Sequence, residues 1–304
     1  LYGGHALLLG LPCGTERGQL MAGNRRDFLK LAGLTAVGTT AVSSIKAPTA
    51  AASTADSHPE ASADGVRWAM VIDLRKFSKD DALIERCVEA CHREHNVPNW
   101  EDDPKNEVKW IWADDFETAF HSQEFHFIRE DLKGKPTLLL CNHCDNPPCT
   151  RVCPTQATWK RDIDGIVMMD WHRCIGCRYC VVACPYGSRS FNWKDPRPAI
   201  DEITADYPTR MRGVVEKCTF CEERLARGLE PACVEACGNE EIVFGDLNDP
   251  SSKVRQLLAE RMAIRRKAGL GTQPEVYYVI DDPRTLQETA PAAVVDGAEG
   301  GDHA

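Results

Sequence analysis

The run Cys174-Ile-Gly-Cys177-Arg-Tyr-Cys180-Val-Val-Ala-Cys184-Pro185 decides the fold of this chain. Its spacing, C-x2-C-x2-C-x3-C-P, is the bacterial motif that binds cubane iron–sulfur clusters. Three closely spaced thiolates, on a loop that contains Gly176, bind three corners of one cubane. The fourth cysteine lies one helical turn further on and binds the neighbouring cluster, and Pro185 ends that turn. The motif therefore predicts a second cluster beside the first.

Fourteen of the 15 cysteines fall into four such groups, and Cys13 stands apart from them. Besides the quoted run, the groups are Cys87 with Cys91, then Cys141-x2-Cys144-x4-Cys149-x3-Cys153-Pro154, and Cys218-x2-Cys221-x11-Cys233-x3-Cys237. Zinc is the main alternative, because paired C-x2-C motifs also form tetrahedral zinc sites. Zinc needs two pairs of thiolates, whereas the unit here is three plus one. The repeated unit therefore favours 4Fe–4S clusters over zinc and over a disulfide framework.

The rule that the last cysteine of one group binds the neighbouring cluster assigns three complete sets of ligands. They are Cys141, Cys144, Cys149 and Cys184; Cys174, Cys177, Cys180 and Cys153; and Cys218, Cys221, Cys233 and Cys91. A fourth site would keep only Cys87 and Cys237, and two ligands do not hold a cubane. We predict three 4Fe–4S clusters and a vacated fourth site. There Cys87 and Cys237 would face one another and could form a disulfide if the geometry permits.

Histidines near the first group allow two other interpretations. The stretch Cys87-Val-Glu-Ala-Cys91-His92 has one residue more than the C-x-x-C-H motif for haem attachment. His92 or His95 could replace a missing cluster ligand, as histidine does in Rieske centres. The simpler interpretation is that both are polar residues at the end of a helix.

No Ser/His/Asp constellation, acid/base pair or phosphate loop competes with the cysteines, so we expect no catalytic residues. Arg173, Arg178 and Tyr186 lie beside cluster loops, where charges and hydrogen bonds tune reduction potentials. Solvated surface and packing are the alternative roles for these three. The formal net charge of −10 excludes a general nucleic-acid binder, and a mean hydropathy of −0.37 excludes a multi-span membrane protein.

Residues 1–52 are interpreted as a leader. Asn24-Arg25-Arg26-Asp27-Phe28-Leu29-Lys30 is a twin-arginine pattern, and Ala50-Ala51-Ala52 fits a small-residue cleavage site. The apolar run between them, 31–45, is too short and too polar to span a membrane. We expect Met21 to be the native start and the Tat pathway to export the protein to the periplasmic side of the cytoplasmic membrane. A chance Arg-Arg before a weak helix is the alternative.

Apolar stretches before and after the cysteine groups predict short strands at 68–73, 137–140, 165–170, 241–244 and 276–280, with a helix over about 251–267. Strand, cluster loop and short helix recur, and the second and third groups begin at 141 and 174, which marks an internal repeat. We predict an α+β fold of two ferredoxin-like units related by a pseudo-twofold repeat. One comprises 66–95 plus 205–245, with one retained cluster and the vacated site; the other comprises 136–204, with two clusters.

The remaining segments are an insertion at 96–135, a C-terminal extension at 246–289 and a disordered tail at 290–304. Aromatic residues crowd the insertion, and they either pack a core or form a docking surface for a partner. They are Trp100, Trp110, Trp112, Phe116, Phe120, Phe125 and Phe127.

Together, the cysteine groups, the strands before them and the leader resemble the four-cluster ferredoxin-like subunits of membrane-associated respiratory oxidoreductases. The resemblance covers about 66–285 and rests on Cys87-Val-Glu-Ala-Cys91-His92-Arg-Glu-His-Asn-Val-Pro98, Cys141-Asn-His-Cys-Asp-Asn-Pro-Pro-Cys149 and Cys174-Ile-Gly-Cys-Arg-Tyr-Cys180. Polysulfide, DMSO and formate-linked enzymes have such subunits. Within the superfamily the chain is most similar to the DsrO-like periplasmic subunits of the DsrMKJOP complex of dissimilatory sulfite reduction. The depleted first group departs from the four-cluster pattern.

This resemblance implies an electron-transfer subunit rather than an enzyme. Its partners would be a quinone-interacting integral membrane subunit and a multihaem cytochrome c, and it would associate with the membrane only through them. An electron-transfer beta subunit of an exported molybdopterin oxidoreductase is a second possibility, and a structural zinc protein is a third. A catalytic partner that purifies with the chain would identify the second, and lack of visible absorbance would identify the third.

Overall fold

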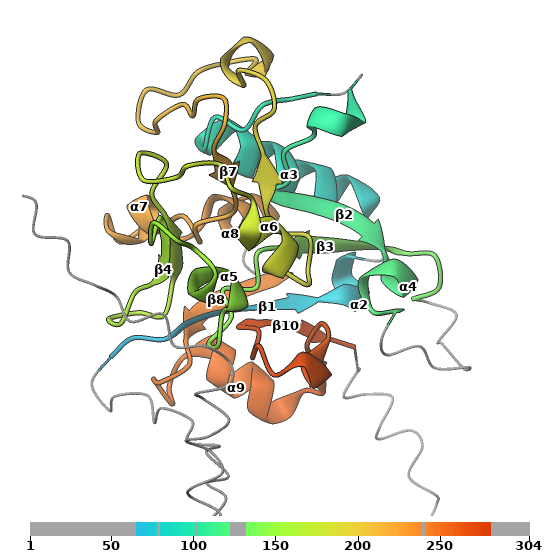
Figure 1. The fold of residues 1–304 in the computed structure, drawn as a ribbon. Coiled ribbons are helices and arrows are strands. Elements are labelled where there is room, and N and C mark those ends of the chain that lie inside the picture. The colour runs from blue at the N-terminus through green and yellow to red at the C-terminus, as the bar shows by residue number, and fades with distance from the viewer. Residues whose placement is uncertain (1–64, 78–79, 101–102, 122–131, 239–240, 281–304) are drawn as a thin grey trace, which may run out of the picture. The chain divides into compact units, whose positions relative to one another are not determined.

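A four-stranded sheet brings together the two ends of the described chain, in the order β8-β1-β10-β9 (Figure 1). The computed structural model describes residues 65–77, 80–100, 103–121, 132–238 and 241–280, so the predicted leader and tail lie outside them. The central strand β1 (Trp68–Asp73) pairs antiparallel with β8 (Ile242–Asp246) and parallel with β10 (Val276–Val279). The expected strands at 68–73, 241–244 and 276–280 are therefore confirmed.

Strand β1 is buried on both faces, which explains its continuous apolar sequence. Met70 and Ile72 point into the main core, whereas Ala69 and Val71 pack under helix α9 (Lys253–Glu260). Ser252 caps α9 by accepting a hydrogen bond from the Arg255 backbone N–H. The sheet is thus an inner layer between α9 and the part of the chain that carries the cysteines.

The predicted helix over 251–267 is wrong in its second half. Helix α9 ends at Glu260, and Arg261 is already extended. The chain then forms β9 (Ala263–Ile264), which pairs antiparallel with β10. Ile264 lies opposite Tyr278 in this pairing. The spacing of Ile264 from the apolar residues before it fits a helix, but the residue belongs to the sheet.

Three antiparallel hairpins build the rest of the frame. They are β2 (Ile111–Asp115) with β3 (Pro136–Leu140), β4 (Thr158–Lys160) with β5 (Val167–Met169), and β6 (Ser190–Phe191) with β7 (Val215–Glu216). Strand β3 confirms the strand expected at 137–140, and β5 lies within that expected at 165–170. The pairing of β2 with β3 makes the predicted insertion part of the frame.

Helices lie between these strands. They are α2 (Leu74–Phe77), α3 (Asp81–Glu94), α4 (Phe116–Ala119), α5 (Pro148–Arg151), α6 (Tyr179–Ala183), α7 (Glu222–Leu225) and α8 (Ala232–Cys237), with 3-10 turns at Pro104–Asn106, Arg197–Ala199 and Ala268–Leu270. Helix α3 packs against α8. The mixture of helices and strands confirms the predicted α+β class, and the pseudo-twofold relation stays a prediction.

Aromatic residues of the segment 96–135 pack in the core. Trp110, Phe116 and Phe120 are buried, and Trp100 and Trp112 are partly buried against the same core. Phe125 and Phe127 lie outside the described residues. For the aromatic residues that the structure describes, core packing is therefore the interpretation that holds.

Candidate iron–sulfur cluster sites

Three sets of four thiols come together around the cluster loops. Site A consists of Cys141, Cys144, Cys149 and Cys184; site B of Cys153, Cys174, Cys177 and Cys180; and site C of Cys91, Cys218, Cys221 and Cys233. These are the sets expected from the spacing, and the neighbourhoods described below bring each of them together. All of these cysteines are free in the structure.

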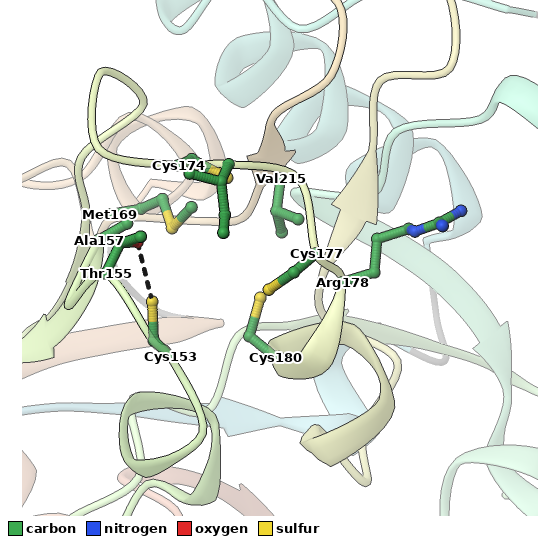
Figure 2. A pocket seen from close by; sticks show the side chains of 10 residues that line it. Cys153, Thr155, Ala157, Met169, Cys174, Cys177, Arg178, Cys180 and Val215 are labelled. Carbon is green, nitrogen blue, oxygen red and sulfur yellow. Dashed lines mark hydrogen bonds between the residues drawn. The ribbon is translucent and has the colours of Figure 1, made fainter. Parts of the chain in front are cut away.

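The four thiols of site B line one pocket (Figure 2). Cys153 follows α5, Cys174 and Cys177 lie on the loop after β5, and Cys180 lies in α6. Met169 and Val215 form the apolar wall of the pocket. In Figure 2 the sulfur atoms of Cys153, Cys177 and Cys180 point into the space that the labelled residues surround.

Site A lies between β3 and the end of α6. Cys141 directly follows β3, Cys149 lies in α5, and Cys184 is the residue that ends α6. Burial raises the pKa of the Cys144 thiol, and its neighbours Cys141, Cys149 and Cys184 raise it further. These four thiols are thus close enough to repel one another when ionised.

Site C joins segments that are far apart in the sequence. Cys91 lies in α3, Cys218 follows β7, Cys221 precedes α7, and Cys233 lies in α8. Burial raises the pKa of Cys91 well above its ordinary value, and Cys218, Cys221 and Cys233 raise it further. Burial also raises the pKa of Cys218 to about 12. Helix α3 therefore supplies the fourth thiol of a set whose other three lie beyond residue 217.

The C-x-x-C turns of the three sites share an unusual backbone conformation. The residue before the second cysteine has a positive φ in each: +39° at His143, +70° at Gly176 and +57° at Phe220. Residues other than glycine rarely adopt this left-handed backbone conformation. At Gly176 a Cβ atom would lie only 2.4 Å from the carbonyl oxygen of Gly213. Glycine is therefore required at position 176 for steric as well as conformational reasons.

The donor sets fit 4Fe–4S clusters. Each set has four sulfur donors, and in sites A and C they are almost entirely buried apart from the half-buried Cys184. Thiolates packed this closely repel one another and are poorly solvated, which is why the pKa of Cys91, Cys144 and Cys218 is raised. Cationic iron removes both penalties, because thiolates are its preferred ligands in such clusters.

Both histidines near site C have partners outside the thiol set, and His95 Nδ1 also lies 3.7 Å from Cys91 Sγ. The Nδ1 atom of His95 lies 2.8 Å from the carbonyl oxygen of Cys91, and its Nε2 lies 2.9 Å from Glu223 Oε1. His92 interacts with the backbone of Ile111, and burial lowers its pKa to about 4. Helix α3 ends at Glu94. These contacts favour polar residues at a helix end over cluster ligands.

Cys87 and Cys237, the predicted orphans, lie together between α3 and α8. The Cys87 thiol interacts with the Cys237 thiol, which raises its pKa, and it donates to the carbonyl oxygen of Cys233 at 3.5 Å. Cys237 donates to the carbonyl oxygen of Val234 at 3.1 Å. Both residues are buried, and neither is in a disulfide in this structure.

Two of the three predicted tuning residues have partners other than the thiols. Arg173 is exposed and pairs with Asp170 at 3.3 Å. Arg178 stacks on Trp193, with its guanidinium carbon 4.6 Å from the ring centroid. Tyr186 is buried near site A and bonds to the hydroxyl of Thr272.

Sequence reasoning missed two buried cations, Arg189 and Lys217. Arg189 donates from Nη2 to Cys149 Sγ at 3.0 Å, and Lys217 donates from Nζ to the carbonyl oxygen of Cys218 at 2.7 Å. Lys217 directly precedes a predicted ligand, and that position was the one signal in the sequence.

Comparisons with known proteins agree with this geometry. Residues 136–198 and 203–247 match the family model of the 4Fe-4S dicluster domain. The chain is 39% identical over 276 residues to the Hdr-like menaquinol oxidoreductase iron-sulfur subunit 1 of Archaeoglobus fulgidus, covering 84% of this chain and 97% of that protein. It is 38% identical over 236 residues to the menaquinone reductase iron-sulfur cluster-binding subunit of Nitratidesulfovibrio vulgaris, covering 70% and 89%. It is 39% identical over 222 residues to a tetrathionate reductase subunit of Salmonella typhimurium, covering 71% and 74%.

Fold and thiol sets thus define a protein that binds 4Fe–4S clusters. The chain belongs to the superfamily of iron–sulfur subunits of respiratory oxidoreductases, as its resemblance to polysulfide and DMSO reductase subunits implied. Such relatives are electron-transfer rather than catalytic subunits. Among the described residues, no helix is long and apolar enough to span a membrane.

Proposed function

We propose that this chain relays single electrons through three 4Fe–4S clusters, held at sites A, B and C, between a periplasmic cytochrome and a quinone-interacting membrane subunit. The observation that carries the proposal is that the fold brings together three sets of four cysteines. No substrate bond is made or broken in such a relay. The clusters that these cysteines would hold would supply one-electron transfer.

The contacts between sites support a linear order B–A–C. Arg189 interacts with Cys149 and Cys141 of site A and also with Cys180 of site B. The thiol of Cys218 in site C interacts with that of Cys141 in site A. Site A therefore adjoins both of the others and forms the middle of the relay.

Site B is the end at which a redox partner can approach. Cys153, Cys174 and Cys177 are only half-buried. Apolar side chains on the same loop and on α6 are exposed, with Ile175 at 65%, Tyr179 at 61% and Val182 at 87%. Exposed apolar residues gathered beside a cluster site favour a protein partner that covers them. Electrons would enter or leave the relay there.

Two observations support the partners proposed here. Menaquinol and menaquinone appear in the names of two relatives that this chain covers over most of their length, which favours a quinone-linked membrane subunit. The predicted twin-arginine leader favours a function on the periplasmic side, where a multihaem cytochrome c would be the soluble partner. Sulfite or sulfur respiration as the pathway rests on the sequence resemblance alone.

A beta subunit of an exported molybdopterin oxidoreductase is the second candidate. It is favoured by the matches to the tetrathionate reductase subunit and to a putative dimethyl sulfoxide reductase iron-sulfur subunit of Halobacterium salinarum. Purification from membranes with mild detergent separates the two candidates. Recovery of a multi-span subunit together with a cytochrome supports the first proposal, and recovery of a large molybdenum-containing subunit supports the second.

Helix α3 offers a matched pair of variants for the cluster assignment. Cys91 and Cys87 lie one turn apart, and the proposal places only Cys91 at a cluster. We expect about twelve iron atoms per chain in the native protein and in Cys87→Ala, but about eight in Cys91→Ala. EPR-monitored redox titration should show one cluster signal fewer in Cys91→Ala alone. About sixteen iron atoms in the native protein, or equal losses in both variants, would refute the assignment.

A further inference from the structure

Two cations are buried beside the thiols without a carboxylate partner. Lys217 is 0% exposed and Arg189 is 4% exposed. In the part of the chain that the structure describes, every hydrogen bond of their charged groups goes to a sulfur, a hydroxyl or a backbone carbonyl oxygen. Burying a charge without a counter-charge is costly, so these two residues require an explanation.

Arg189 lies between sites A and B. Its Nη2 donates to Cys149 Sγ at 3.0 Å and to Thr158 Oγ1 at 2.9 Å. The groups that raise its pKa against the effect of burial are cysteines of both sites, led by Cys149 and Cys180. The guanidinium therefore faces two thiol sets at once.

Lys217 lies between sites A and C. Its ammonium group donates to the carbonyl oxygens of Val167 and Cys218. Burial lowers the pKa of Lys217, and the nearby Arg189 lowers it further, whereas Cys141 of site A and Cys218 of site C act in the opposite direction. The two cations thus occupy the two gaps of the B–A–C line.

Elsewhere this fold neutralises a buried cation with a carboxylate. Arg210 and Glu216, both with fully buried side chains, pair at 2.7 Å. Glu216 directly precedes Lys217, yet its carboxylate bonds to Trp110 Nε1 at 2.9 Å and to Asn192, on the side of Arg210. Arg210 thereby neutralises Glu216, and the charge of Lys217 remains available to the thiol sets.

We propose that Arg189 and Lys217 are fixed counter-charges that raise the reduction potentials of the clusters on either side, and that site A, which borders both, has the highest potential of the three. The proposal rests on the cluster ligation proposed above. A 4Fe–4S cluster with four thiolates is anionic, and each electron that enters adds one negative charge. A cation beside it stabilises the reduced form, since net charge and hydrogen bonds to sulfur set the potential.

The test is an EPR-monitored redox titration of the full-length holoprotein, with iron quantified in every sample. Arg189→Met and Lys217→Met remove the charges, and Arg189→Lys and Lys217→Arg retain them. Arg173→Met is the matched control, because Arg173 also neighbours a site B cysteine but is exposed and paired with Asp170. Each titration is repeated at high salt, which screens surface charges far more than buried ones.

We expect each charge-removing variant to shift two clusters to lower potential. The shift should change the ratio of reduced to oxidised cluster at a fixed potential at least tenfold, which is about 59 mV for one electron. The cluster shifted by both variants should be the one with the highest potential in the native protein. Shifts should be small in Arg189→Lys, Lys217→Arg and Arg173→Met, and those of the charge-removing variants should persist at high salt.

Full iron content with less than about a threefold change in that ratio, in Arg189→Met or in Lys217→Met, would overturn the proposal. If either charge-removing variant does not fold with its iron, the charge-retaining variants Arg189→Lys and Lys217→Arg test the inference instead. Loss of iron in these variants too would show that the shape of the side chain is needed rather than its charge, and this would refute the inference. A native protein with far fewer than about twelve iron atoms would instead refute the proposed function.

Discussion

Gly176→Ala tests whether the shared turn of the cluster loops is needed to hold iron. Gly176 has a φ of +70°, and a Cβ atom there would lie 2.4 Å from Gly213 O and 3.1 Å from the ring of Phe191. Gly187 is a matched control. Its φ is +68°, but nothing lies within 4 Å of its Cβ position. Both substitutions carry the same conformational cost, and only Gly176→Ala adds a clash.

The expected magnitudes follow from these two contributions. A left-handed conformation costs an L-residue about 1–2 kcal/mol, and overpacking against a neighbour costs about 1–3 kcal/mol more. Because Gly213 N–H bonds to the carbonyl oxygen of Asn192 at 2.8 Å, the clashing backbone cannot move freely. If opening of the loop precedes iron loss, the clash should accelerate that loss about tenfold for each 1.4 kcal/mol.

The assay is anaerobic transfer of iron to a chelator, followed by visible absorbance and by iron analysis. In Gly176→Ala we expect about one third of the iron, that of site B, to be lost faster than the rest. The rate of this loss should be at least about fivefold higher than in Gly187→Ala. The remaining iron should leave at the native rate. Equal rates in the two variants would refute the reasoning, because the clash would then carry no cost.

Two further predictions concern the frame and the exposed end of the relay. Arg210→Met leaves Glu216 buried and unpaired, so we expect a loss of about 3–5 kcal/mol in unfolding free energy. Adding Glu216→Gln should recover part of it in denaturant unfolding of the holoprotein, and an additive effect of the two would contradict the pairing. Val182→Glu, at a side chain 87% exposed beside site B, should leave iron content unchanged and stability within about 0.5 kcal/mol. It should slow electron transfer with the partner that docks there, measured by stopped-flow, while Val182→Thr should not; equal rates in both would exclude that surface as the docking site.

Much of the cluster arrangement could be predicted because the information is local. Three of the four thiols in each set lie within one cysteine group of the sequence, so they follow from the spacing of that group. The fourth thiol follows from the ferredoxin rule of exchange between groups. For site C that rule linked Cys91 to thiols far along the chain, and the structure brings Cys91 next to Cys218, Cys221 and Cys233.

The pairing of strands that are far apart in the sequence could not be predicted from local sequence patterns. Strand β10 pairs in parallel with β1, matching Met70 to Val276, so the supposed C-terminal extension completes the central sheet. Nothing in either segment marks the other as its partner. Arg189 and Lys217 were missed for a related reason: charged residues are rarely buried without a partner, and only the assembled sites reveal why these two are.

The contact between Cys87 and Cys237 bears on where the proposed relay ends. Cys87 and Cys91 lie on one helix, one turn apart, yet Cys91 faces three thiols of site C whereas Cys87 bonds to Cys237. The Cys87 thiol lies 3.5 Å from the carbonyl oxygen of Cys233, so α3 and α8 pack directly against each other at this position. At this position the two helices are thus in contact with one another. In the relay proposed above, electrons that reach site C would leave from site C itself, and the proposed membrane partner would approach that site rather than the Cys87–Cys237 pair.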